Sequence, residues 1–130
     1  MTGYALARQA YFTKKFLNKR AVMSLDCVFC KIISKQIPSQ PLLETDDLIV
    51  IKDIAPQAPI HYLIIPKRHI TNVAALQLSD RDLMGDLILV ATKLSQMVPA
   101  SAFRLITNNG AAAGQSVFHL HFHFLADKAN

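Results

Sequence analysis

Imidazole and apolar side chains alternate strictly over residues 119–125, which read His-Leu-His-Phe-His-Phe-Leu. A period of two is typical of a β-strand, because successive side chains of a strand point to opposite faces of the sheet. The pattern predicts a strand with an imidazole face, comprising His119, His121 and His123, and an apolar face, comprising Leu120, Phe122 and Phe124. Side chains on one face of a strand lie about 6.5 to 7 Å apart, so one substrate group is within reach of several imidazoles.

The hydrophobic pattern predicts four earlier strands, over residues 41–44, 48–52, 61–65 and 103–107. Thr45, Asp46 and Asp47 separate the first two strands by a polar turn, which indicates a hairpin.

A long amphipathic helix is predicted over residues 79–98, where apolar residues recur at helical spacing. Ser79 is its expected N-cap, and Asp82 supplies a carboxylate three residues later. A short helix is predicted over residues 26–34, with Asp26 as its cap, and a further turn of helix over residues 72–76.

These elements predict an α+β fold, because five strands are joined mostly by short turns and the long helix falls between the third and fourth strands. We expect a five-stranded antiparallel sheet with one long and one or two short helices on one face. A chain of 130 residues fits one domain, which we assign to residues 23–130. No apolar run reaches the about 18 residues of a membrane-spanning helix, so no membrane partner is expected.

The net charge of +5 is concentrated in residues 1–22, which hold five of the fourteen basic residues and no acid. The remainder is neutral, so the charge does not indicate nucleic-acid binding by the domain. Three interpretations of residues 1–22 stay open: an organelle-targeting presequence, a natural extension that packs on the domain, or a start assigned upstream of a true start at Met23. The third is favoured, because the first patterned segment begins directly after Met23.

The two cysteines are separated by only two residues, in Cys27-Val28-Phe29-Cys30. So close a pair is a poor structural disulfide and a better metal-binding or redox pair. We therefore expect a reducing compartment, and a cytoplasmic protein.

The chemistry of the histidine segment admits two readings. In one, a neutral imidazole attacks phosphorus with one nitrogen while its other nitrogen hydrogen-bonds elsewhere, and His121 is the natural nucleophile because it has a histidine on each side. Backbone amides, a side-chain amide and a hydroxyl in residues 114–117 then offer donors for an anion. In the other reading, the alternating histidines are metal ligands without a catalytic role.

Four segments, residues 26–33, 53–61, 65–69 and 114–125, together resemble the histidine triad family, and in particular its nucleotide-binding, phosphoramidase-like branch. The resemblance covers about residues 26–125. It implies the five-stranded fold of that family, a purine nucleotide or nucleotidyl conjugate as ligand, and a homodimer.

The resemblance implies that His121 is the nucleophile that forms a nucleotidyl-histidine intermediate. His123 and His61 position it and handle protons, and Ser116 lies near the leaving group. The implied nucleotide-binding residues are Asp53, Ile54, Val28, Phe29, Ile32, Ile51, Asn108, Gly114, Gln115, Ser116, His121 and His123. Among them Asp53 accepts the ribose hydroxyls, and Val28, Phe29, Ile32, Ile51 and Ile54 form an apolar cleft for the purine.

Only some members of that family have the cysteine pair, and in them it forms half of a structural zinc site. The matching ligands here are Cys27, Cys30, His69 and His119. Two thiolates and two imidazoles suit tetrahedral zinc, and a fully ligated ion is structural, so the chemistry itself requires no cofactor.

The sequence therefore predicts a hydrolase of nucleoside phosphoramidates that acts through covalent histidine catalysis. Three alternatives are a dinucleoside polyphosphate hydrolase, a non-catalytic nucleotide-binding adaptor, and a zinc hydrolase that uses the triad as ligands.

Overall fold

The computed structural model describes residues 26–98 and 102–128. The basic segment of residues 1–22 lies outside this part of the chain. Among the described residues, no helix is both long and apolar enough to cross a bilayer.

Five strands form one sheet in the order β1-β2-β3-β5-β4, and every neighbouring pair is antiparallel. The strands are β1 (Leu43–Glu44), β2 (Leu48–Lys52), β3 (Ile60–Pro66), β4 (Phe103–Ile106) and β5 (Phe122–Ala126). Within residues 26–98 and 102–128 the α-helices are α2 (Val28–Ile33) and α3 (Arg81–Met97), with 3-10 turns at Val73–Ala75, Leu78–Asp80 and Ala111–Ala113. The predicted α+β class, the five strands and the long helix are confirmed.

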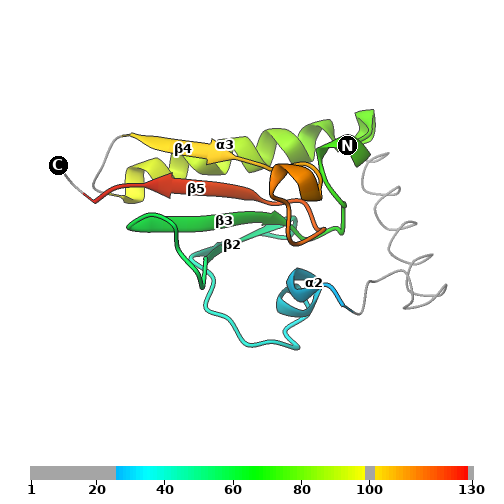
Figure 1. Ribbon diagram of the computed structural model, residues 1–130, viewed down its shortest axis with the longest axis horizontal. Coiled ribbons are helices and arrows are strands. Elements are labelled where there is room, and N and C mark those ends of the chain that lie inside the picture. The colour runs from blue at the N-terminus through cyan, green and yellow to red at the C-terminus, as the bar shows by residue number, and fades with distance from the viewer. Residues whose placement is uncertain (1–25, 99–101, 129–130) are drawn as a thin grey trace.

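The two helices pack on opposite faces of the sheet (Figure 1). Leu48 and Val50 of β2 belong to the core beneath α3, whereas Ile49 and Ile51 belong to the core beneath α2. The prediction that the helices share one face is therefore wrong. Both faces of β2 are covered, which explains why four successive residues of this strand are buried without alternation.

The hairpin of β1 and β2 follows its predicted turn. The hydroxyl oxygen of Thr45 accepts hydrogen bonds from the backbone N–H groups of Asp47 and Leu48, at 3.1 and 3.2 Å. This is the local side-chain bonding that makes threonine a turn residue.

The helix caps differ from the prediction. Cys27, not Asp26, is the N-cap of α2, and its sulfur accepts the backbone N–H of Cys30 at 3.2 Å. The residue at the N-cap position of α3 is Asp80, not Ser79, and its side chain makes no capping hydrogen bond to that helix. A capping box is present one turn earlier, in the 3-10 turn Leu78–Asp80, where the partner of Gln77 is Asp80. Its carboxylate accepts the N–H of Gln77 and forms an ion pair with Arg68, which a serine at that position could not do.

The last strand begins at Phe122, three residues later than predicted. The backbone N–H of Leu120 donates to the carbonyl of Ile70 at 2.6 Å, so residues 119–121 lie against the segment that follows β3 instead of joining the ladder. The apolar half of the predicted pattern is confirmed, because Leu120, Phe122 and Phe124 all pack into the core beneath α3.

Candidate active site

The His121 ring is held by the backbone two residues before it. Its Nδ1 lies 2.7 Å from the carbonyl oxygen of His119. A carbonyl only accepts, so Nδ1 carries the hydrogen, and the neutral ring keeps a lone pair on Nε2. The ring of Phe29 packs edge-on against it at 5.0 Å between centroids. His121 is therefore both oriented and fixed in the tautomer that a nucleophilic Nε2 requires.

Burial lowers the pKa of both His121 and His123. Desolvation lowers the pKa of His121, against opposing contributions from the His119 carbonyl and the Asp53 carboxylate. Desolvation also lowers the pKa of His123, helped by the neighbouring His121 and His61 and opposed by Asp53. In both rings burial thus favours the neutral form.

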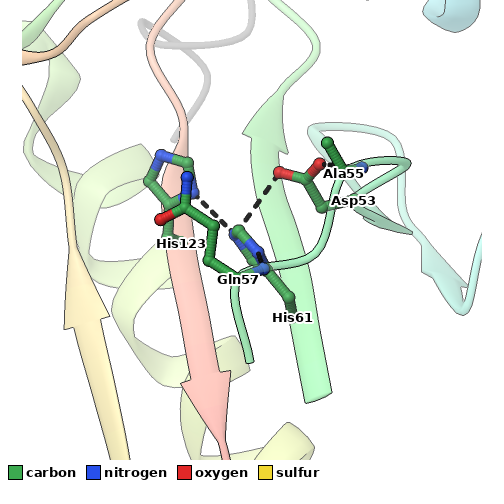
Figure 2. A network of polar contacts seen from close by, with 5 residues as sticks. All are labelled: Asp53, Ala55, Gln57, His61 and His123. Carbon is green, nitrogen blue, oxygen red and sulfur yellow. Dashed lines mark hydrogen bonds and ion pairs between the residues drawn. The ribbon is translucent and has the colours of Figure 1, made fainter. Parts of the chain in front are cut away.

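His61 and His123 form a hydrogen-bonded pair across the β3–β5 ladder, with Nε2 of His61 2.8 Å from Nδ1 of His123 (Figure 2). The backbone N–H of Gln57 donates to Nδ1 of His61 at 3.0 Å. The His61 hydrogen is thus on Nε2 and points to His123, whose own hydrogen is then on its Nε2. The rings of His121 and His123 lie 5.0 Å apart between centroids, so the histidine pair lies beside His121.

Asp53 lies directly after β2 and continues its pairing, because its backbone N–H donates to the carbonyl of His61 at 3.0 Å. One carboxylate oxygen accepts the N–H of Ala55 at 2.8 Å, and the other lies 3.3 Å from Nε2 of His61 (Figure 2). The carboxylate predicted from the sequence is therefore beside the histidine pair.

The glycine-rich loop is braced by Gln115. This buried side chain accepts from the Gly110 N–H at 2.8 Å and from Asn72 at 3.2 Å, and it donates to the carbonyls of Thr71 and Val117 at 2.8 and 3.1 Å. Its backbone N–H donates to the carbonyl of Gly110. Every donor of Gln115 is thus engaged within the fold, so its observed role is to hold the loop.

The other residues predicted on the phosphate side are Asn108, Gly114 and Ser116, which lie in or beside the loop that Gln115 holds. Gly114 has a positive φ of 99° and lies near Asn108, whose amide nitrogen would be 3.8 Å from a Cβ on Gly114. Its N–H donates to the carbonyl of Ala111. Ser116 is exposed beside the loop, so its hydroxyl is accessible to a ligand.

The apolar residues predicted for the purine cleft do not all meet. Phe29, Ile51 and Ile32 belong to the core beneath α2. Val28 is 38% exposed and Ile54 is fully exposed, so neither belongs to that cluster. The observed apolar wall next to His121 is Phe29.

Two contacts that fix the site could not be read from the sequence. The hydroxyl of Thr107 donates to the His121 carbonyl at 2.8 Å, and the Gln57 contact with His61 is made by the backbone. A backbone donor leaves no residue-type signal, and a threonine at the end of a strand is common for reasons of propensity alone.

The second cluster is the predicted set Cys27, Cys30, His69 and His119, whose ligand atoms all lie within 4.8 Å of one another. Nδ1 of His119 is 3.3 Å from the Cys27 sulfur and 3.6 Å from the Cys30 sulfur. Nδ1 of His69 is 3.3 Å from the Cys30 sulfur and 3.1 Å from Nδ1 of His119.

This donor set fits a tetrahedral metal ion. Zinc bond lengths imply edges of about 3.3 to 3.8 Å between the ligand atoms, close to the observed separations. Nε2 of His119 lies 2.8 Å from the carbonyl oxygen of Pro66, which keeps the hydrogen on Nε2 and directs the lone pair of Nδ1 at the cluster. The cluster can bind a metal, and it removes His119 from the catalytic group.

Comparison with known proteins agrees with this geometry. A family model described as scavenger mRNA decapping enzyme C-term binding matches residues 26–130. An uncharacterized HIT-like protein of Synechocystis sp. is 41% identical over 107 residues, which cover 82% of this chain and 94% of the relative.

Solved structures give the same result. A HIT family hydrolase from Clostridium thermocellum is 47% identical with a TM-score of 0.75, over 78% of this chain and 90% of that chain. A histidine triad protein from Clostridium difficile is 35% identical with a TM-score of 0.75, over 82% and 94%. The chain belongs to the histidine triad (HIT) family.

The lowered pKa of His123 predicts a pH dependence of stability. In the unfolded chain His123 takes up a proton at the ordinary histidine pKa of 6.5, whereas in the folded protein its pKa is lower. The unfolded state therefore binds more protons as the pH falls below about 6.5, and the free energy of unfolding decreases. Urea denaturation at pH 7.5 and 5.5 measures this loss. His123→Asn should show a smaller loss than the wild type, and an equal or larger loss in the variant contradicts the assignment.

Proposed function

We propose that this protein hydrolyses nucleoside phosphoramidates and related nucleotidyl conjugates through a nucleotidyl-His121 intermediate. The observation that supports this most strongly is the hydrogen bond from Nδ1 of His121 to the His119 carbonyl, because it leaves a lone pair on Nε2 for attack. The HIT family hydrolases among the structural relatives support hydrolysis as the reaction class.

In the first step, the Nε2 lone pair of His121 attacks the α-phosphorus and the bond from phosphorus to the leaving nitrogen breaks. The electron pair of that bond moves to the nitrogen, which takes up a proton and leaves as an amine. The His121 ring becomes positively charged, and its Nδ1–H keeps its hydrogen bond to the His119 carbonyl. That carbonyl stabilises the positive ring, since hydrogen bonds to charged groups are stronger than neutral ones.

In the second step, a water oxygen attacks the same phosphorus and the bond to Nε2 breaks, returning its electron pair to the ring. The water releases one proton, which balances the proton gained by the amine. In this proposal, the Nε2–H of His123 donates a hydrogen bond to the phosphoryl group while charge develops.

Nucleotide binding in this proposal uses Asp53 for the ribose hydroxyls, Ser116 near the leaving group and Asn108 near the phosphate. Phe29, Ile32 and Ile51 support the purine side from the core beneath α2. Val28 and Ile54 are exposed, so in this proposal they contact a purine only at the outer edge of the cleft. Gly114 and Gln115 contribute by shaping the loop that presents Ser116.

A dinucleoside polyphosphate hydrolase is the second candidate, because the matched family model is described for a decapping enzyme and the nucleophile would be the same. The zinc-hydrolase alternative is less consistent with the structure. His119 contacts the cysteines through Nδ1, and His123 is hydrogen-bonded to His61. The triad of His119, His121 and His123 therefore does not form one ligand set.

The covalent step predicts a trapped intermediate. Mass spectrometry of protein quenched rapidly after mixing with adenosine phosphoramidate should show one added nucleotidyl group, and His121→Ala should lack it and lose activity by about a thousandfold or more. The rate with a diadenosine polyphosphate, measured in parallel, separates the two candidate substrates. Full turnover by a well-folded His121→Ala variant would rule the mechanism out.

We further propose that Cys27, Cys30, His69 and His119 hold a structural zinc ion. Metal analysis of the purified protein should give one zinc per chain, and Cys30→Ser should lower that content while Lys31→Ser, on the same helix, should not. Bound zinc at a thousandfold excess over its Kd stabilises the fold by about 4 kcal/mol, so chelation should lower the Tm. An unchanged Tm and no bound metal would contradict the site.

A homodimer is proposed from the surface of α3 and β4. β4 is an edge strand, and the exposed apolar residues on these elements are Ile88, Leu89, Met97 and Phe103. Sedimentation analysis should give the mass of two chains. Leu89→Asp should shift the protein towards the monomer, whereas Ile54→Asp, in a fully exposed loop position, should not; a monomeric wild type contradicts the proposal.

A further inference from the structure

The place of Asp53 in the fold suits two different functions of the site. Its position after β2 suits a ribose diol, and one of its carboxylate oxygens also lies 3.3 Å from Nε2 of His61. In the proposed function the first contact recognises substrate and the second touches the histidine pair. Figure 2 shows this carboxylate beside His61 and the His61–His123 hydrogen bond. In the proposed function, one carboxylate would therefore connect nucleoside recognition with the hydrogen bond of the histidine pair.

His61 has one hydrogen and two acceptors for it. The backbone N–H of Gln57 occupies Nδ1, so the hydrogen is on Nε2. From there it can donate to Nδ1 of His123 at 2.8 Å or to the Asp53 carboxylate at 3.3 Å. The two acceptors compete, because one N–H gives only one short, linear hydrogen bond.

The same three side chains place their ligand atoms within 4.8 Å of one another, which is also compatible with a metal site. A metal on Nε2 of His61 would require the hydrogen to move to Nδ1, where the Gln57 N–H already donates. Two donors would then face each other at 3.0 Å. The contacts of His61 thus favour a hydrogen-bond network over a metal centre.

A ribose hydroxyl that donates to the free Asp53 oxygen would satisfy the carboxylate that now competes for the His61 hydrogen. The other carboxylate oxygen is already held by the Ala55 N–H at 2.8 Å, so the side chain cannot turn to serve both partners freely. With ribose bound, the His61 hydrogen is committed to His123. That in turn fixes the His123 hydrogen on Nε2, in a ring whose centroid lies 5.0 Å from that of His121.

We propose that Asp53 is a positioning residue that makes the hydrogen bond between His61 and His123 depend on the ribose hydroxyls. The inference rests on the proposed function, in which a ribonucleotide occupies this site. It assigns to the ribose an effect on the rate of the chemical step in addition to binding.

The kinetic test compares an adenosine phosphoramidate with its 2′,3′-dideoxy analogue. In the wild type, loss of the hydroxyls should lower kcat about tenfold, the size of one hydrogen bond, beyond any change in KM. In Asp53→Asn the side-chain oxygen can still accept the Ala55 N–H, while an amide group replaces the oxygen that competes for the His61 hydrogen. The kcat values of the two substrates should then become equal.

Asp46→Asn is the matched control, since it removes one acidic charge in the exposed turn between β1 and β2 and should keep the wild-type ratio of kcat values. Asp53→Ala is a second test that lacks the side chain altogether and should also show equal kcat values. The proposal is overturned if the analogue changes only KM in the wild type, or if the kcat ratio persists in Asp53→Asn.

A binding experiment separates this inference from the proposed activity. In proton NMR spectra, AMP should move the His61 Nε2–H resonance downfield as its bond to His123 strengthens, and 2′,3′-dideoxy-AMP should not. Equal shifts with both nucleotides refute the coupling whether or not the protein hydrolyses phosphoramidates. A ribose-dependent shift without any turnover supports the coupling and rejects the proposed reaction.

Discussion

The hydrogen bond between Nδ1 of His121 and the carbonyl of His119 is the constraint on which the site depends. It fixes one tautomer, orients the ring and leaves a single nitrogen available for attack. The bond exists because residues 119–121 leave the strand ladder, which frees the His119 carbonyl to face the ring that follows it. The departure from regular β-structure is thus what creates the environment of the His121 ring.

His119 connects this constraint with the rest of the fold. Its ring is completely buried, contacts the cysteines of α2 through Nδ1 and donates to the Pro66 carbonyl through Nε2. The edge of Phe29, which lies between those cysteines in the sequence, packs against both His119 and His121. A metal bound by the cluster would therefore hold together the end of β3, helix α2 and the peptide whose carbonyl positions the His121 ring.

The sequence predicted what depends on local pattern. The strands, the long helix and the apolar packing of Leu120 and Phe124 followed from periodicity. The set of Cys27, Cys30, His69 and His119 was implied by the resemblance to the histidine triad family, and the fold brings these four residues together. The sequence did not predict what depends on tertiary contacts. Asp80, and not Ser79, lies at the start of α3, where it forms an ion pair with Arg68. Helix α2 covers the second face of the sheet, where Cys27 and Cys30 contact His119 and His69. The roles of Gln115 and Gln57 arise from backbone groups brought together only in the fold.

The tautomer of His121 tests this account most directly. Long-range correlation of ring protons with the two ring nitrogens in ¹⁵N-labelled protein at pH 7 distinguishes a protonated from an unprotonated nitrogen. The hydrogen bond to His119 predicts a protonated Nδ1 and an unprotonated Nε2. A hydrogen found on Nε2 would contradict it, because the nitrogen that faces the substrate would then have no lone pair to give to phosphorus.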